Sequence, residues 1–152
     1  MNKKEKILLE LYFPHFISPT SSRFEEFFSN LEESYEYVNS IITYNIYPER
    51  IISGEDKRTS IVIKNIPKYI KKREIRAMIE AFANINYLGI IKDKTMKKFI
   101  IAYLNVINYR SIVPIFMGLR KHIINGKYQS KMLELYYSEY QGKENLKKFI
   151  HE

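Results

Sequence analysis

Cysteine is absent from the 152-residue sequence, and glycine and proline occur only five times each. Without cysteine the chain forms no disulfide framework and offers no thiolate ligand to a metal ion. This absence favours a reducing compartment, and we expect the protein in the nucleus, the cytoplasm or both. Because no low-complexity tract or internal repeat interrupts the sequence, its length predicts one domain with an extension.

The sequence also lacks the motifs of catalysis and of metal binding. Its three histidines, His15, His122 and His151, are scattered, and no pair has the spacing of a metal site. It contains no glycine-rich phosphate loop and no nucleophile elbow. These absences predict a protein that is not an enzyme and that has no catalytic residue, no metal, no cofactor and no small-molecule substrate.

One apolar run, Ile7–Ile17, has to be distinguished from a membrane or signal segment. It is too short to span a bilayer, and Glu10, Pro14 and His15 interrupt it. No small-residue cleavage site follows it. We therefore expect a strand or helix packed on the core here, and no membrane partner.

The formal net charge of +8 is divided unevenly along the chain. Residues 1–56 hold five basic and ten acidic residues, a net charge of −5, whereas residues 57–152 hold the other twenty basic residues and seven acidic ones, a net charge of +13. A segment this basic is typical of proteins that bind a polyanion such as a nucleic acid. A solvated lysine face or a membrane-binding surface has a similar composition, so charge alone leaves the partner open.

From residue 58 onward the hydrophobic pattern predicts the element order β-α-β-β-α-β. We expect strands over Thr59–Asn65, Tyr87–Lys92, Lys97–Val106 and Lys131–Tyr137, helices over Lys71–Phe82 and Ser111–His122, and a last short helix over Glu144–Ile150. This is the order of the ferredoxin-like α+β fold, in which two helices cover one face of a four-stranded antiparallel sheet. The other face of the sheet is then free for a ligand.

Residues 1–43 form an acidic N-terminal extension to this domain. Within Arg23–Val38 the apolar residues recur at helical spacing beside an acidic face, which predicts one helix. Ile41–Tyr47 alternates loosely and predicts a short strand. Two roles fit the acidic helix: it lies against the basic domain and competes with its ligand, or it packs with its acidic face in solvent.

Two blocks of the sequence carry a resemblance to a known family. Residues 44–67 read YNIYPERIISGEDKRTSIVIKNIP, and residues 131–149 read KMLELYYSEYQGKENLKKF. Both resemble the C-terminal RNA recognition motif (RRM) of the Mei-two-like proteins, which are RNA-binding regulators of meiosis and development. The resemblance covers residues 44–151. It implies an RRM that binds single-stranded RNA in the control of meiosis or differentiation.

In an RRM, aromatic rings on the open sheet face stack on unpaired bases. The resemblance puts Val62, Ile101 and Tyr103 at the three ring positions, so two of the three are aliphatic. Strand alternation turns Tyr136 toward the same face, where it supplements Tyr103. The alternative is that the C-terminal helix or the N-terminal extension covers both rings, and we expect such a cover over Tyr136 more than over Tyr103.

Basic residues at loops and strand ends of an RRM hold the phosphates of the RNA. Further RNA-binding residues predicted around the sheet face are Arg58, Lys64, Asn65, Lys97, Lys98, Lys131 and Lys143. Lys143 follows Gln141-Gly142, a match to the family that also suits a plain turn into a helix. The competing hypothesis is an RRM-fold protein-interaction module with a protein partner and weak or no RNA binding, which the aliphatic side chains at positions 62 and 101 favour.

Overall fold

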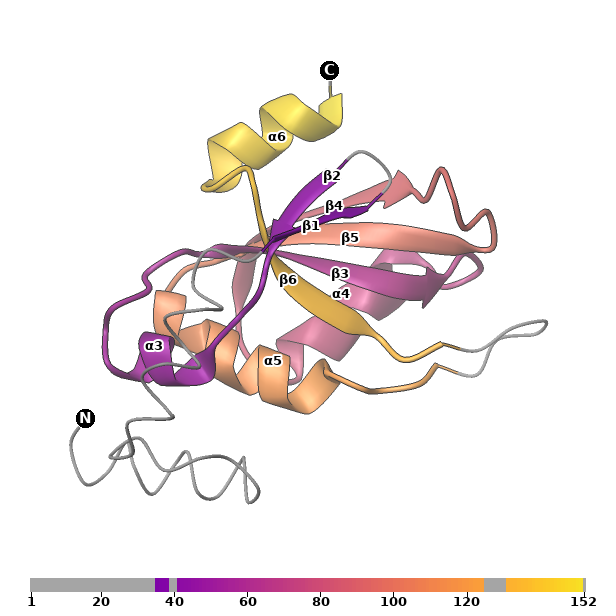
Figure 1. Ribbon diagram of the computed structural model, residues 1–152. Helices are drawn as coiled ribbons and strands as arrows, with labels where there is room; N and C mark the ends of the chain where they lie inside the picture. Colours follow the sequence, from indigo (N-terminus) through magenta and orange to yellow (C-terminus); the bar gives the residue numbers. More distant parts are fainter. Residues whose placement is uncertain (1–34, 39–40, 125–130, 152) are drawn as a thin grey trace.

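Among the residues that the structure describes, which are 35–38, 41–124 and 131–151, six strands form one antiparallel sheet in this computed structural model (Figure 1). The strands are β1 (Tyr35–Val38), β2 (Ile41–Tyr44), β3 (Ser60–Pro67), β4 (Ile85–Lys92), β5 (Phe99–Val106) and β6 (Glu134–Ser138). The helices are α3 (Pro48–Ile52), α4 (Lys72–Glu80), α5 (Ile112–Leu119) and α6 (Lys143–His151), with a 3₁₀ turn over Tyr109–Ser111.

The chain runs through β3, α4, β4, β5, α5 and β6 in the predicted order, so the β-α-β-β-α-β prediction is confirmed. In the sheet these four strands lie in the order β6-β3-β5-β4. Helices α4 and α5 lie on one side of the sheet (Figure 1). Helix α4 buries Ile75 and Ile79, which are one turn apart, because its apolar residues recur at helical spacing.

The sheet is wider than the four strands predicted, because β2 pairs with β6 and β1 pairs with β2. Tyr35–Val38, predicted as the end of a helix, forms β1 instead, where tyrosine and valine suit a paired strand. The rest of that predicted helix lies outside the described residues. The strand predicted over Ile41–Tyr47 stops at Tyr44 because Pro48 opens α3, a short helix that the sequence pattern did not indicate.

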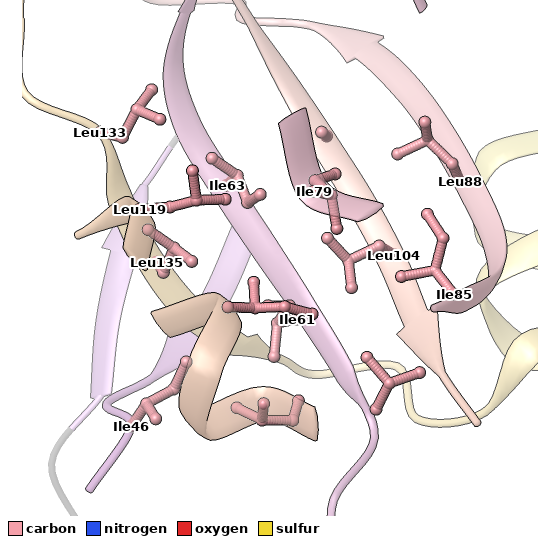
Figure 2. Close-up of a cluster of buried hydrophobic side chains, with 14 of the residues drawn as sticks. Ile46, Ile61, Ile63, Ile79, Ile85, Leu88, Leu104, Leu119, Leu133 and Leu135 are labelled. Atoms are coloured by element: carbon pink, nitrogen blue, oxygen red, sulfur yellow. The ribbon is translucent and has the colours of Figure 1, made fainter. Parts of the chain in front are cut away.

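The main core lies between the sheet and the helices α4 and α5, as Figure 2 shows for part of it. Every second residue of the central strands points into this core. Its members from these strands and from the residue before β6 are Ile61, Ile63, Ala102, Leu104, Val106, Leu133, Leu135 and Tyr137. The residues between them must therefore face the opposite side of the sheet.

Candidate nucleic-acid interface

The face of the sheet opposite α4 and α5 carries a second, smaller apolar cluster. Its buried members come from β3, β4, β5 and α6: Val62, Tyr87, Ile101, Tyr103 and Leu146. The strand register pairs Val62 with Tyr103 on one side and with Tyr136 on the other. Val62, Ile101, Tyr103 and Tyr136 thus share one face as predicted, and we call this surface the platform face.

Helix α6 lies over the platform face, on the side of the sheet away from α4 and α5 (Figure 1). Val62 and Ile101 are only 1% exposed, and Tyr103 is 0% exposed. The prediction that these three side chains are open to a ligand is therefore wrong for this conformation. The cover expected as the alternative is present, but it lies over Tyr103, whereas Tyr136 is half-buried.

The cover forms because α6 has an apolar side of its own. Leu146, Phe149 and Ile150 recur at intervals of three and four residues, so they lie along one side of the helix and pack against the platform face. The ring of Phe149 meets Tyr103 edge-on, with 5.1 Å between the ring centroids. Ile41 of β2 packs against the same cluster. This helical spacing in the sequence is the signal that could have predicted the cover.

Gln141, two residues before α6, is hydrogen-bonded to Thr59 and to Ser60, the first residue of β3. Its side-chain oxygen accepts hydrogen bonds from the backbone N–H groups of Thr59 and Ser60, both at 3.0 Å. Its side-chain nitrogen donates to the carbonyl oxygens of Ser60 and Ser138, at 2.9 and 2.8 Å. The backbone N–H of Gly142 adds a bond to Ser60 Oγ at 2.8 Å. Gln141 is therefore an anchor for α6, a role that a plain turn would not require.

Burial also changes the chemistry of Tyr103. Removal from water raises the pKa of its phenol well above the usual value, with smaller contributions from Tyr140 and Glu139. Among the described residues, the Tyr103 hydroxyl is buried and has no hydrogen-bond partner. A buried hydroxyl without a partner is unfavourable, on the order of 1–3 kcal/mol. The covered state of the platform face is thus stabilised by apolar contact at some polar cost.

Tyr136, Glu134 and Lys64 form a small polar group at the β6 side of the platform face. The Tyr136 hydroxyl donates to Glu134 Oε2 at 3.0 Å, and Lys64 Nζ lies 3.6 Å from the same oxygen. Lys64 Nζ also lies 5.3 Å from the centroid of the Tyr136 ring, within range of a cation–π contact. Lys64 is only 7% exposed, so in this conformation its charge is directed to Glu134.

Asn65 and Arg58 have structural partners that the sequence analysis did not predict. Asn65 adopts a φ of 71°, and its Nδ2 donates to the carbonyl oxygen of Met132 at 2.8 Å, which ties the end of β3 to the segment before β6. Arg58 donates two side-chain hydrogen bonds to Asp56. Its guanidinium lies 4.1 Å from the ring centroid of Tyr137, which belongs to the helix-side core. The prediction that Arg58 borders the platform face is therefore wrong.

The remaining predicted lysines are accessible. Lys97 and Lys98 are exposed in the connection between β4 and β5, Lys143 is exposed at the start of α6, and Lys131 is half-buried before β6. Lys92 and Lys94 are exposed beside the first pair. In the β4–β5 connection the buried Asp93 accepts backbone hydrogen bonds from Thr95 and Met96, which fixes the turn that presents these lysines. We call Lys92, Lys94, Lys97 and Lys98 the hairpin lysines.

A cavity of about 320 Å³ lies near α3, lined by Tyr47, Arg50, Glu55, Asp56 and Arg58. Each arginine in it faces a carboxylate, since Arg50 lies 3.9 Å from Glu55 and Arg58 is bound by Asp56. Because the charges of its lining residues balance, the cavity does not favour any one class of ligand. Within the described part of the chain, no cluster of side chains could hold a metal ion and no helix is long and apolar enough to cross a membrane.

The sequence is similar to plant proteins of one family. It is 31% identical over 136 residues to Protein MEI2-like 5 of Arabidopsis thaliana, a match that covers 83% of this chain and 17% of that protein. It is 34% identical over 105 residues to Protein MEI2-like 1 of the same plant, covering 66% of this chain and 11% of that protein. Protein MEI2-like 4 of Oryza sativa subsp. japonica is 33% identical over 108 residues, covering 68% and 11%. The chain therefore spans less than a fifth of these relatives' length.

No family model matches the sequence. Among solved structures, the chain is similar to one in a PID-3 TOFU-6 RRM domain complex, with a TM-score of 0.44 and 15% identity over 58% of this chain and 92% of that one. A complex of two RRM domains gives a TM-score of 0.40 at the same identity, over 53% and 92%. The β-α-β-β-α-β order and the strand order described above define the fold independently of these matches. The chain, which has the RNA recognition motif fold, is thus a homologue of one segment of the MEI2-like proteins.

Proposed function

We propose that this chain binds single-stranded RNA, with unpaired bases contacting the platform face and phosphates contacting the hairpin lysines. The observation that carries the proposal is the row formed by Tyr136, Val62 and Tyr103 in register on three neighbouring strands. Rings placed on a sheet in this way stack on bases without requiring a particular sequence. The proposal is one of binding and not of catalysis.

Charge supports the same proposal. Residues 57–152 carry a net charge of +13, and the four hairpin lysines are exposed at the end of β4 and in the connection that follows it. If about four lysines neutralise phosphates, the logarithm of the affinity should fall with the logarithm of the salt concentration at a slope of roughly −3, using about −0.7 per contact on a single strand.

The direct test is a titration of the purified chain with a random-sequence pool of single-stranded RNA at two salt concentrations. Tyr136→Ala removes the one platform ring that is partly open, and we expect it to weaken binding by about 5- to 160-fold, since a stacked base contributes roughly 1–3 kcal/mol. Tyr136→Phe is the matched control, because it keeps the ring and loses only the hydroxyl that bonds Glu134. Binding that neither Tyr136→Ala nor salt weakens would refute the proposal.

The second candidate function is that of a protein-interaction module. The aliphatic side chains of Val62 and Ile101 at two ring positions, both covered by α6, favour it. Under this alternative the chain does not bind the RNA pool at low salt, although it folds cooperatively. The same titration therefore separates the two candidates.

A role in the cell follows from the family resemblance. The resemblance to the Mei-two-like proteins supports RNA-dependent control of meiosis or differentiation, in the nucleus, the cytoplasm or both. Since the chain spans less than a fifth of its relatives' length, this role is proposed for the domain and not taken over from a whole protein. Localising the tagged chain in dividing and meiotic cells would test it.

A further inference from the structure

The ring of Phe149 lies against Tyr103, in the part of the platform face where the proposed function places a base. It meets Tyr103 edge-on, with a centroid distance of 5.1 Å and an interplanar angle of 64°. Tyr140 then stacks on Phe149, with a centroid distance of 4.4 Å and an angle of 18°. Edge-on and offset-stacked arrangements are those that aromatic side chains prefer in contact with each other. A base and Phe149 cannot occupy this place together.

The two ends of α6 are held by different forces. At its start, Gln141 and Gly142 make the hydrogen bonds to β3 described above. Farther along, contact is apolar and comes from Leu146, Phe149 and Ile150. Among the described residues, no side-chain hydrogen bond or ion pair joins residues 146–151 to the sheet. Opening of the far part of the helix would therefore break apolar contacts alone, while the hydrogen bonds at its start remain.

Gly142 is suited to be the pivot of such a movement. Its φ is +92°, a conformation that other residues rarely adopt, and no atom lies within 4 Å of the place where a Cβ would stand. The glycine is thus required by the backbone and not by crowding, in contrast to Gly89. At Gly89, in the middle of β4, a Cβ would collide with Ile150 Cδ1 and lie 2.8 Å from the Tyr87 hydroxyl oxygen.

We propose that α6 is a removable cover: it turns about Gly142, with Gln141 still anchored, and exposes Tyr103, Ile101 and Val62 to the bases of single-stranded RNA. The inference rests on the proposed function and adds its regulation. The unpartnered Tyr103 hydroxyl supports it, because opening returns this group to water. If only a small fraction of molecules is open, the apparent dissociation constant for RNA is raised by the inverse of that fraction.

The first test compares two substitutions on α6. Phe149→Ala removes the ring that occupies the base position, whereas Lys147→Ala changes an exposed residue of the same helix and serves as the control. We expect Phe149→Ala to bind the RNA pool at least about tenfold more tightly than the wild type, because the open fraction rises. Lys147→Ala should not bind more tightly. Equal affinity of Phe149→Ala and the wild type for the RNA pool would refute the proposal that α6 is a removable cover.

The second test locks the cover shut. Because the chain has no cysteine, a Gly89→Cys and Ile150→Cys pair would be its sole thiols, and the proximity of Ile150 Cδ1 to the Gly89 position favours a crosslink. The oxidised variant should bind RNA at least about tenfold more weakly than the reduced variant, and a reductant should restore binding. Equal affinity of the oxidised and reduced forms would contradict the cover.

These outcomes separate the inference from the proposed function. If neither the wild type nor Phe149→Ala nor the reduced double variant binds the RNA pool, while all unfold cooperatively, RNA binding itself is refuted. If all bind, with the same affinity whether the cover is intact, weakened or locked, RNA binding stands and the cover is refuted.

Discussion

The two faces of the sheet both carry a cluster of buried apolar side chains, yet these clusters are covered in different ways. The helix side is covered by α4 and α5, which are part of the continuous β-α-β-β-α-β chain and pack through a large core. The platform face is covered by one terminal helix, held by Gln141 and by three apolar side chains. Burial on the helix side is thus a condition of folding, whereas burial of the platform face depends on one helix that we propose to be removable.

The largest effect is expected when one buried side chain on each face of the sheet is truncated and the two variants are compared. Ile63→Ala opens a cavity in the helix-side core, and we expect it to lower the free energy of unfolding by about 2–5 kcal/mol. Leu146→Ala also truncates a fully buried side chain, but it should chiefly release α6. Urea unfolding together with hydrogen exchange of β3 and β5 amides would measure both. Equal loss of amide protection in β3 by the two variants would show that α6 is as integral as the core.

The next largest effect is a pH dependence of the free energy of unfolding, which Glu49 on the helix side causes. Burial raises the pKa of Glu49 from its usual value of 4.5 to about 7, with Arg50 lowering it and Glu55 raising it. Between these two pH values the folded chain binds the proton more readily than the unfolded chain does, so stability falls as the pH rises from about 4.5 to 7. The loss is on the order of 3 kcal/mol, from about 1.4 kcal/mol per pKa unit.

Glu49→Gln is the matched variant for this effect, since it keeps the shape of the side chain and removes the titration. We expect its free energy of unfolding to vary less between pH 5 and pH 7.5 than that of the wild type, and to be higher at pH 7.5. Urea midpoints at the two pH values measure this difference. An unchanged pH dependence in Glu49→Gln would show that the titration of Glu49 does not cause the loss of stability.

A smaller effect concerns the anchor of α6. Gln141→Ala deletes the side-chain bonds to Thr59, Ser60 and Ser138, and we expect it to destabilise the closed position of α6 by about 1–3 kcal/mol. Asn145→Ala is the control, because Asn145 is exposed and bonds only the carbonyl oxygen of Gln141. Hydrogen exchange of residues 143–151 should accelerate in the first variant and change little in the second. Equal hydrogen-exchange rates in the two variants would show that Gln141 does not anchor α6.

The smallest effect compares the two glycines that α6 requires. Gly142→Ala forces a side chain into a left-handed conformation, which costs about 1–2 kcal/mol and leaves the packing of α6 intact. Gly89→Ala causes no such strain and instead pushes Ile150 away from β4. We expect Gly142→Ala to lower the thermal unfolding temperature and Gly89→Ala to increase the exposure of Tyr103 to solvent. Tyr103 that stays buried in Gly89→Ala would contradict the close packing of α6 on β4.

The sequence predicted the parts of this structure that repeat a simple period. The family resemblance identified the side of the sheet that Val62 and Tyr103 face, and strand alternation added Tyr136, because each strand has one register consistent with a buried side. Alternation could not predict what covers the second side, because an aliphatic or aromatic residue there fits a ligand and a helix equally well. The spacing of Leu146, Phe149 and Ile150 contained that information, but its partner is far away in the sequence.

Partners of charged and polar residues were harder to predict. Arg58 was expected beside the platform face, but the nearby Asp56 and the ring of Tyr137 hold it on the other side. Gln141 matched a family block, yet its role depends on backbone groups of β3 about eighty residues away. Hydrogen bonds of this kind follow from the tertiary fold and leave no local pattern, which is why the sequence alone did not assign them.

An NMR measurement of the contact between Phe149 and Tyr103, in the free chain and after addition of single-stranded RNA, tests whether RNA displaces α6 from the platform face. We predict nuclear Overhauser effects between the two rings in the free chain and their loss when RNA binds. Contacts between these rings that persist in the RNA-bound chain would show that α6 is not displaced.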